Sequence, residues 1–146
     1  MKEFVKDIQM RWSDLDPNFH LRHSIYYDWG ALCRIEFLKE FNLTAHVMQE
    51  LHFGPILFRE ECVFKKEIRD GDKITIDLTL LKAKKDYSRW SFRHRVIKDG
   101  DTISAILTVE GAWIDTVKRK LTAPPPIAEK VFSEMPADEN FHWMDL

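Results

Sequence analysis

Residues 24–41 read SIYYDWGALCRIEFLKEF, and the spacing of their apolar side chains decides the fold class. Apolar residues recur every three or four positions, which is the period of an α-helix. Ser24 is a candidate N-cap, Asp28 suits the positive end of the helix dipole, and Asn42 is a candidate stop. Several residues off the main apolar stripe are also apolar: Tyr26, Ala31, Ile35 and Leu38. A helix that is apolar nearly all round is expected to be covered on several sides.

Runs with the alternating period of a β-strand lie on both sides of this helix. One precedes it at residues 6–12, where Ile8, Met10 and Trp12 share a face. The others follow it, at residues 56–68, 73–81, 89–97 and 102–115. Short polar turns join them, and Gly111 is expected to mark a bulge or a close approach of backbones. This order predicts an α+β domain with an antiparallel sheet of about five strands curled around the helix.

The remaining segments add little to this core. Residues 44–50 predict a short helical turn capped by Thr44, and the stretch around 127–133 predicts one or two more turns after three prolines. We therefore expect one domain over residues 1–146, with a short C-terminal tail from about residue 124.

The composition excludes several classes of function. The chain has 146 residues and a net charge of -2, which argues against a nucleic-acid binder that works by bulk positive charge. No run of about 18 apolar residues occurs, so no membrane span is expected. Neither an apolar N-terminal leader nor a cysteine-rich pattern is present, and Cys33 and Cys62 are expected to be free thiols in a reducing compartment. The expected location is the cytoplasm.

The loop before the helix, RWSDLDPNFHLRH at residues 11–23, holds the residues best suited to chemistry. Its functional side chains are two carboxylates, two histidines and an arginine: Asp14, Asp16, His20, His23 and Arg22. The loop ends at a helix N-terminus, where free backbone N–H groups stabilise an anion. A carboxylate that attacks or activates water, together with donors for an oxyanion, is what acyl transfer requires. The irregular loop lacks a recognised ligand spacing, so we expect no metal there.

These residues resemble those of the hotdog-fold thioesterases of the 4-hydroxybenzoyl-CoA thioesterase-like group. The resemblance extends over roughly residues 8–114. It is carried by the Asp14-x-Asp16 motif, Tyr26 near the helix start, the Arg34-x-Glu36 pair, the turn at residues 69–72 and the hairpin at Ser88. It implies the hotdog fold, in which the sheet wraps around one long central helix. We expect Arg34 and Glu36 to lie on the exposed face of this helix or to make dimer contacts.

The resemblance also implies roles for individual residues. Asp16 corresponds to the catalytic carboxylate, acting as nucleophile or general base, and His23 occupies the place of a histidine seven residues after it. Backbone N–H groups of His23 and Ser24 would hold the oxyanion. Residues expected to contact substrate are His20, Arg22 and Tyr26, although Tyr26 is equally a candidate for the core. Where the family often has Gly-His-Val-Asn-Asn, this chain has FHLRH at residues 19–23, so Phe19 replaces a glycine and Arg22 adds a charge.

A basic hairpin at Lys84, Lys85 and Arg89 is a candidate binding site for the phosphates of coenzyme A, or else a solvated hairpin tip. The resemblance predicts hydrolysis of an acyl-CoA to a free acid and CoA, with no cofactor apart from the CoA of the substrate. It also implies a homodimer or homotetramer, because the family builds its sites between two subunits. Two alternatives remain open: a dehydratase or hydratase of the same fold, and a non-catalytic acyl-binding or scaffold subunit.

Overall fold

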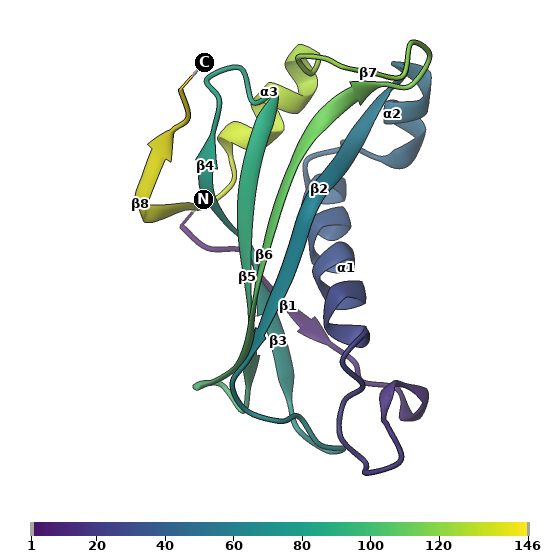
Figure 1. Cartoon of the computed structure of the whole chain (residues 1–146), viewed down its shortest axis with the longest axis vertical. Coiled ribbons are helices and arrows are strands. Elements are labelled where there is room, and N and C mark those ends of the chain that lie inside the picture. The colour runs from purple at the N-terminus through teal and green to yellow at the C-terminus, as the bar shows by residue number, and fades with distance from the viewer. Residues whose placement is uncertain (1, 146) are drawn as a thin grey trace.

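Helix α1 (Ile25–Glu40) lies along one face of a curved sheet in the computed structural model, which describes residues 2–145 (Figure 1). The long strands β2 (Phe53–Phe64), β6 (Thr102–Asp115) and β5 (Arg89–Lys98) run side by side in that order. On the far side of β5, strands β3 (Ile74–Asp77) and β4 (Thr79–Ala83) follow each other, and β1 (Val5–Ile8) pairs with β3. This is the predicted α+β hotdog architecture.

Over residues 2–145 the sheet has eight strands, where the sequence predicts about five. The predicted run 73–81 is interrupted at Leu78, whose N–H donates to the carbonyl of Phe4 at 3.1 Å, so two short strands replace one. The other additions are β7 (Lys120–Leu121) and β8 (Ala137–Trp143). Strand β8 runs parallel to β4, so the sheet is not wholly antiparallel.

The first strand is shorter than predicted. It ends at Ile8, and Trp12 begins a short 3-10 helix, η1 (Trp12–Asp14). The carboxylate of Asp14 accepts a hydrogen bond from the Arg11 backbone N–H at 2.9 Å, which turns the chain away from the extended conformation. Trp12 is 82% exposed, so the expectation that it shares a face with Met10 in the strand is wrong.

The helix boundaries follow the predicted signals with one exception. Asn42 takes the left-handed conformation, at φ 67°, where α1 has ended. The hydroxyl of Thr44 accepts from the Val47 N–H at 3.2 Å and caps α2 (Ala45–Glu50), as predicted. Ser24 occupies the N-cap position of α1, but its hydroxyl makes no bond to the helix backbone and accepts from Arg22 Nε at 3.2 Å instead.

The core lies between α1 and the concave face of the sheet. Phe37 and Trp113 are fully buried there, while Leu32 and Ile35 of α1 remain 47% and 40% exposed. The chain therefore does not by itself cover α1 on every side. Helix α3 (Pro126–Ser133) closes one end of the core with Phe132 (Figure 1). Both cysteines are free, as predicted.

Gly111 is the predicted site of close approach. A Cβ atom on Gly111 would overlap the indole of Trp90 and lie 2.5 Å from the carbonyl oxygen of Ile56. Glycine is therefore required because only a hydrogen fits between β6, the Trp90 ring and β2. The irregular pairing expected nearby lies on the partner strand, where the register shifts between Leu57 and Arg59.

Candidate active site

Asp16 holds together the tight turn that precedes α1. Its N–H donates to the carbonyl of His20 at 2.8 Å, and its carbonyl accepts from the Phe19 N–H at 2.9 Å. Its carboxylate Oδ1 accepts from the backbone N–H groups of Asn18 at 2.8 Å and His20 at 3.1 Å. Within residues 2–145, Oδ2 of Asp16 makes no hydrogen bond. One carboxylate oxygen is thus fixed by the turn, and the other is available to a substrate.

Phe19 adopts the conformation that the family's glycine favours. Its φ is 63°, in the left-handed region, which costs an ordinary residue about 1–2 kcal/mol. Phe19 is 66% exposed. Phe19 thus takes a backbone conformation that glycine adopts freely, and it places an exposed aromatic residue in the Asp16 turn.

Asp14 anchors this loop. Its side chain is buried, and its carboxylate accepts from the Arg11 guanidinium at 2.9 Å, while its carbonyl accepts from the Arg22 N–H at 2.8 Å. Burial alone would raise the pKa of Asp14, but the hydrogen bonds from the backbone and guanidinium of Arg11 outweigh it and hold this pKa below its ordinary value. Asp14 is a structural residue of the loop.

The start of α1 offers free donors beside the Asp16 turn. In the part of the chain that the structure describes, the N–H groups of His23 and Ser24 donate to no backbone or side-chain acceptor, whereas the Ile25 N–H donates to the Arg22 carbonyl at 3.0 Å. These are the two groups predicted to hold an oxyanion. The His23 side chain is exposed, as are those of Arg22 and Ser24.

Two residues that were predicted to contact substrate, His20 and Tyr26, contact other parts of the protein. His20 Nε2 lies 3.0 Å from Glu67 Oε2, so its imidazole is engaged with the segment that follows β2. Tyr26 is buried, with its ring edge-on to Phe64 at 5.0 Å, and burial raises the pKa of its hydroxyl to about 12. The core alternative for Tyr26 is the one that the structure supports.

The basic hairpin does not meet the Asp16 loop within one chain. Lys84, Lys85 and Arg89 lie at the β4–β5 turn, at the opposite end of the molecule from the loop that precedes α1 (Figure 1). The Arg89 guanidinium stacks over the ring of Phe58 on β2 at 4.8 Å. Any site that uses both the hairpin and Asp16 must therefore draw them from two chains.

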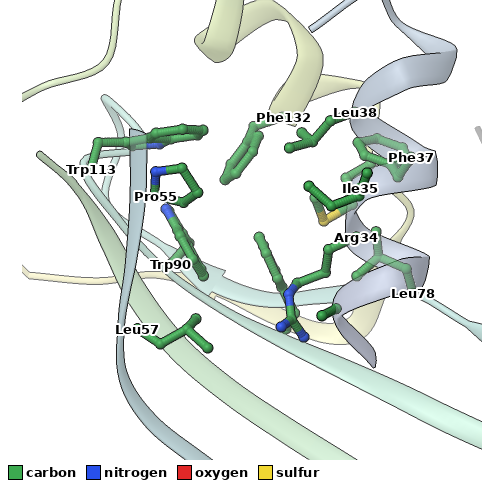
Figure 2. Close-up of a pocket in the computed structure, with 13 residues that line it drawn as sticks. Arg34, Ile35, Phe37, Leu38, Pro55, Leu57, Leu78, Trp90, Trp113 and Phe132 are labelled. Carbon is green, nitrogen blue, oxygen red and sulfur yellow. The ribbon is translucent and has the colours of Figure 1, made fainter. Parts of the chain in front are cut away.

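An apolar cavity of about 170 Å³ lies between α1 and the sheet (Figure 2). Residues of α1, β2, β5, β6 and α3 line it, among them Ile35, Leu57, Trp90, Phe92, Trp113 and Phe132. The contribution of α3 was not predicted, because residues 127–133 carry no sequence signal that places them over the sheet. The alternating positions of Trp90 and Phe92 on β5 do point to a shared face.

Arg34 also lines this cavity, which corrects the expectation of an exposed position. Its guanidinium lies beneath α1, with Nη1 3.0 Å from His94 Nε2 and Nη2 3.6 Å from Glu60 Oε2. Gly30, one turn earlier on α1, leaves room for this approach, since a Cβ there would lie 3.3 Å from both Arg34 and His94. His94 shares the buried face of β5 with Phe92 and Val96. A histidine in this alternating apolar pattern is a sequence signal that could have revealed a buried polar pair.

Two classes of feature are absent from residues 2–145. No cluster of three or more His, Cys, Asp or Glu side chains is arranged to hold a metal ion. The described helices include none that is both long and apolar enough to cross a membrane.

A family model for the thioesterase-like superfamily matches residues 10–132, which is most of the chain. This protein belongs to the thioesterase-like superfamily. The match includes the Asp16 loop, α1 and all the long strands of the sheet. It ends at Phe132, so β8 lies beyond it. No curated protein matches this superfamily member significantly by sequence.

Solved structures of similar fold agree with this assignment. The hypothetical protein SAV2348 from Staphylococcus aureus, solved in complex with CoA, has a TM-score of 0.86 at 16% identity, covering 99% of this chain and 89% of that one. The DHNA-CoA thioesterase of Staphylococcus aureus has a TM-score of 0.81 at 14% identity, covering 92% and 91%. Slr0204, a 1,4-dihydroxy-2-naphthoyl-CoA thioesterase from Synechocystis, has a TM-score of 0.81 at 15% identity, covering 90% and 96%. At these identities the likeness establishes the fold.

Proposed function

We propose that this thioesterase-like protein hydrolyses an acyl-CoA to a free acid and CoA, with Asp16 as the catalytic carboxylate. One observation carries the proposal: Asp16 keeps one carboxylate oxygen free in a turn that leads to two free N–H groups at the start of α1. A nucleophile or base next to oxyanion donors is the arrangement that acyl transfer needs. The two CoA thioesterases of the same fold add support.

Two routes are open to Asp16. As a nucleophile, Oδ2 attacks the thioester carbonyl, CoA leaves as the thiolate, and water hydrolyses the resulting acyl anhydride. As a general base, Oδ2 accepts a proton from water while that water attacks the carbonyl. In both routes negative charge develops on the carbonyl oxygen, and we propose that the N–H groups of His23 and Ser24 donate hydrogen bonds to this oxygen.

We propose further that the site is shared between two copies of the chain. Within residues 2–145, strand β2 pairs only with β6, so its other edge is free there. Four apolar residues on this strand are exposed: Leu57, Phe58, Val63 and Phe64. Such an edge needs covering. Strand β2 runs from the end near α2 to the end where Phe64 contacts Tyr26 at the start of α1. Antiparallel pairing with β2 of a second copy exchanges these ends across a two-fold axis.

The exchange of ends explains why the parts of the site are far apart in one chain. It would bring the partner's Asp16 loop towards the cavity mouth at Pro55 and Leu57 and towards the basic hairpin. We assign the phosphates of CoA to Lys84, Lys85 and Arg89 on this basis, and the CoA complex of SAV2348 supports a CoA-binding role for the fold. Two free cysteines fit a reducing compartment, so we place the activity in the cytoplasm.

Release of free thiol from a panel of short, medium, long and aromatic acyl-CoAs tests the proposal. We expect hydrolysis of at least one class, and a solution mass of two or four chains. Acyl binding without thiol release would favour the scaffold alternative. Water addition to an enoyl-CoA, without thiol release, would favour the hydratase.

A further inference from the structure

Phe132 closes one end of the apolar cavity. Its ring lies 5.2 Å from Trp113, 5.5 Å from Phe92 and 5.9 Å from Trp90, all centroid to centroid, and all three partners line the cavity. Trp90 and Phe92 stack face to face at 4.4 Å and form one wall. Phe132 itself is buried. The end of the cavity beneath α3 is thus a packed aromatic surface (Figure 2).

The segment that carries Phe132 is fixed at both of its ends. Before α3, the Thr122 N–H donates to the Trp113 carbonyl at 3.0 Å. After α3, the Leu80 N–H donates to the Pro136 carbonyl at 2.7 Å, and β8 continues along β4. Hydrogen bonds to the sheet therefore hold both flanks of the segment that places Phe132 at the end of the cavity.

The cavity has its mouth between α1 and the edge strand β2. Ala31 and Ile35 of α1 and Pro55 and Leu57 of β2 line it, and all four are exposed. This mouth faces the edge at which the proposed second copy would pair. An acyl chain that entered here would run under α1 towards Phe132.

The cavity is small. Its volume of about 170 Å³ is close to the ~150 Å³ of an engineered apolar cavity that binds benzene. Among the described residues, Arg34 is the only charged one that lines it, and Glu60 and His94 already engage its guanidinium. The space therefore suits a short apolar chain or a single ring, and it excludes a long acyl chain.

We propose that this cavity is the acyl pocket, that it takes a short or single-ring apolar acyl group, and that Phe132 sets its length. The proposal rests on the thioesterase function proposed above. It assigns Phe132, the last residue of the family match, as the specificity-determining residue.

The test compares kcat/KM of wild type, Phe132→Ala and Phe132→Leu on straight-chain acyl-CoAs from butanoyl to hexadecanoyl. Wild type should prefer short chains. In Phe132→Ala each further methylene that enters the opened space should raise kcat/KM roughly fourfold, the equivalent of ~0.8 kcal/mol per methylene. Phe132→Leu should give a smaller shift in chain-length preference, and it provides a second test if the alanine variant does not fold. Thermal unfolding shows whether each variant is folded.

Phe141→Ala is the matched control. Phe141 belongs to the same C-terminal segment but packs on Trp143, at 4.9 Å, and does not line the cavity. Its chain-length profile should stay that of wild type. A folded Phe132→Ala or Phe132→Leu variant that hydrolyses the same chain lengths as wild type would overturn the proposal.

The two proposals fail in distinguishable ways. Thiol release from no acyl-CoA would refute the thioesterase function and leave the pocket to be judged by binding. Binding of free acids of graded length is then measured through tryptophan emission, to which Trp90 and Trp113 contribute. An identical length preference of wild type and Phe132→Ala in this assay would refute the role of Phe132.

Discussion

Arg34 of α1 donates a hydrogen bond to His94 of β5 inside the core, with 3.0 Å between Nη1 and Nε2. A guanidinium has no acceptor, so His94 Nε2 accepts and the proton must lie on Nδ1. Nδ1 is 2.8 Å from the carbonyl oxygen of Asp77, to which it donates. Burial, reinforced by the charge of Arg34, lowers the pKa of His94 to about 3. The pair thus ties the helix to the sheet with a neutral imidazole.

This pairing makes stability depend on pH. An unfolded histidine titrates near pH 6.5, so below this pH the unfolded chain binds a proton at His94 that the folded chain does not bind. The free energy of unfolding should therefore fall by up to ~1.4 kcal/mol per pH unit on acidification from 6.5 towards 5. Urea unfolding should show this slope reduced in His94→Gln relative to wild type. His46→Gln, at an exposed site, should keep the wild-type slope, and equal slopes in all three proteins would contradict the assignment.

Gly111→Ala should destabilise the fold by about 1–3 kcal/mol, because its Cβ would meet a backbone carbonyl and a buried indole that cannot both move. Gly54→Ala is the matched control on β2, where the new Cβ would lie 3.8 Å from Thr116. Thermal unfolding of the two variants measures the difference. Equal melting temperatures would contradict this prediction, because they would show that β6 and β2 can move apart to admit the methyl group without loss of stability.

The two helix caps should respond differently to removal of their hydroxyl groups. Thr44→Ala removes the bond to the Val47 N–H and should cost ~1 kcal/mol of stability. Ser24→Ala removes only a bond from an exposed arginine side chain and should cost clearly less. Chemical denaturation gives both values, and a larger loss at Ser24 would mean that its hydroxyl caps α1 in solution.

The shared site predicts complementation between two inactive variants. Asp16→Asn removes the catalytic carboxylate, and Leu57→Trp fills the cavity mouth. In a mixed dimer both defects fall in one site and the other site is intact, so co-refolding in equal amounts should restore about a quarter of the sites. Each variant must remain dimeric by solution mass. Mixed dimers without recovered thiol release would contradict a site shared across a two-fold axis.

Sequence periodicity predicted the parts of this fold that local patterns determine. The spacing at residues 24–41 gave α1 almost to the residue, and the backbone approach at Gly111 was predicted from a glycine within a strand. The packing of α3 over the cavity was not predictable, since Phe132 is placed by hydrogen bonds at Thr122 and Pro136 that join distant segments. The interruption at Leu78 also depends on a distant partner, Phe4.

The candidate site divides in the same way. The Asp16 turn is built from contacts within five residues, so its motif was visible in the sequence. The inward position of Arg34 was not, because a charged residue on a helix is ordinarily exposed. Its burial is tolerated because the neutral His94 accepts its hydrogen bond and the Glu60 carboxylate lies 3.6 Å from Nη2. Similarly, the distance between the Asp16 loop and Lys84 could not be predicted, because it depends on how the whole chain folds.

The rate of thiol release by Asp16→Asn, on the best acyl-CoA substrate, tests the central claim most directly. Asparagine keeps the Oδ1 acceptor that the Asn18 and His20 N–H groups need, so the turn and the melting temperature should persist while the carboxylate is lost. The account predicts a fall in kcat of at least ~100-fold in a folded protein. A folded Asp16→Asn variant with the kcat of wild type would contradict it.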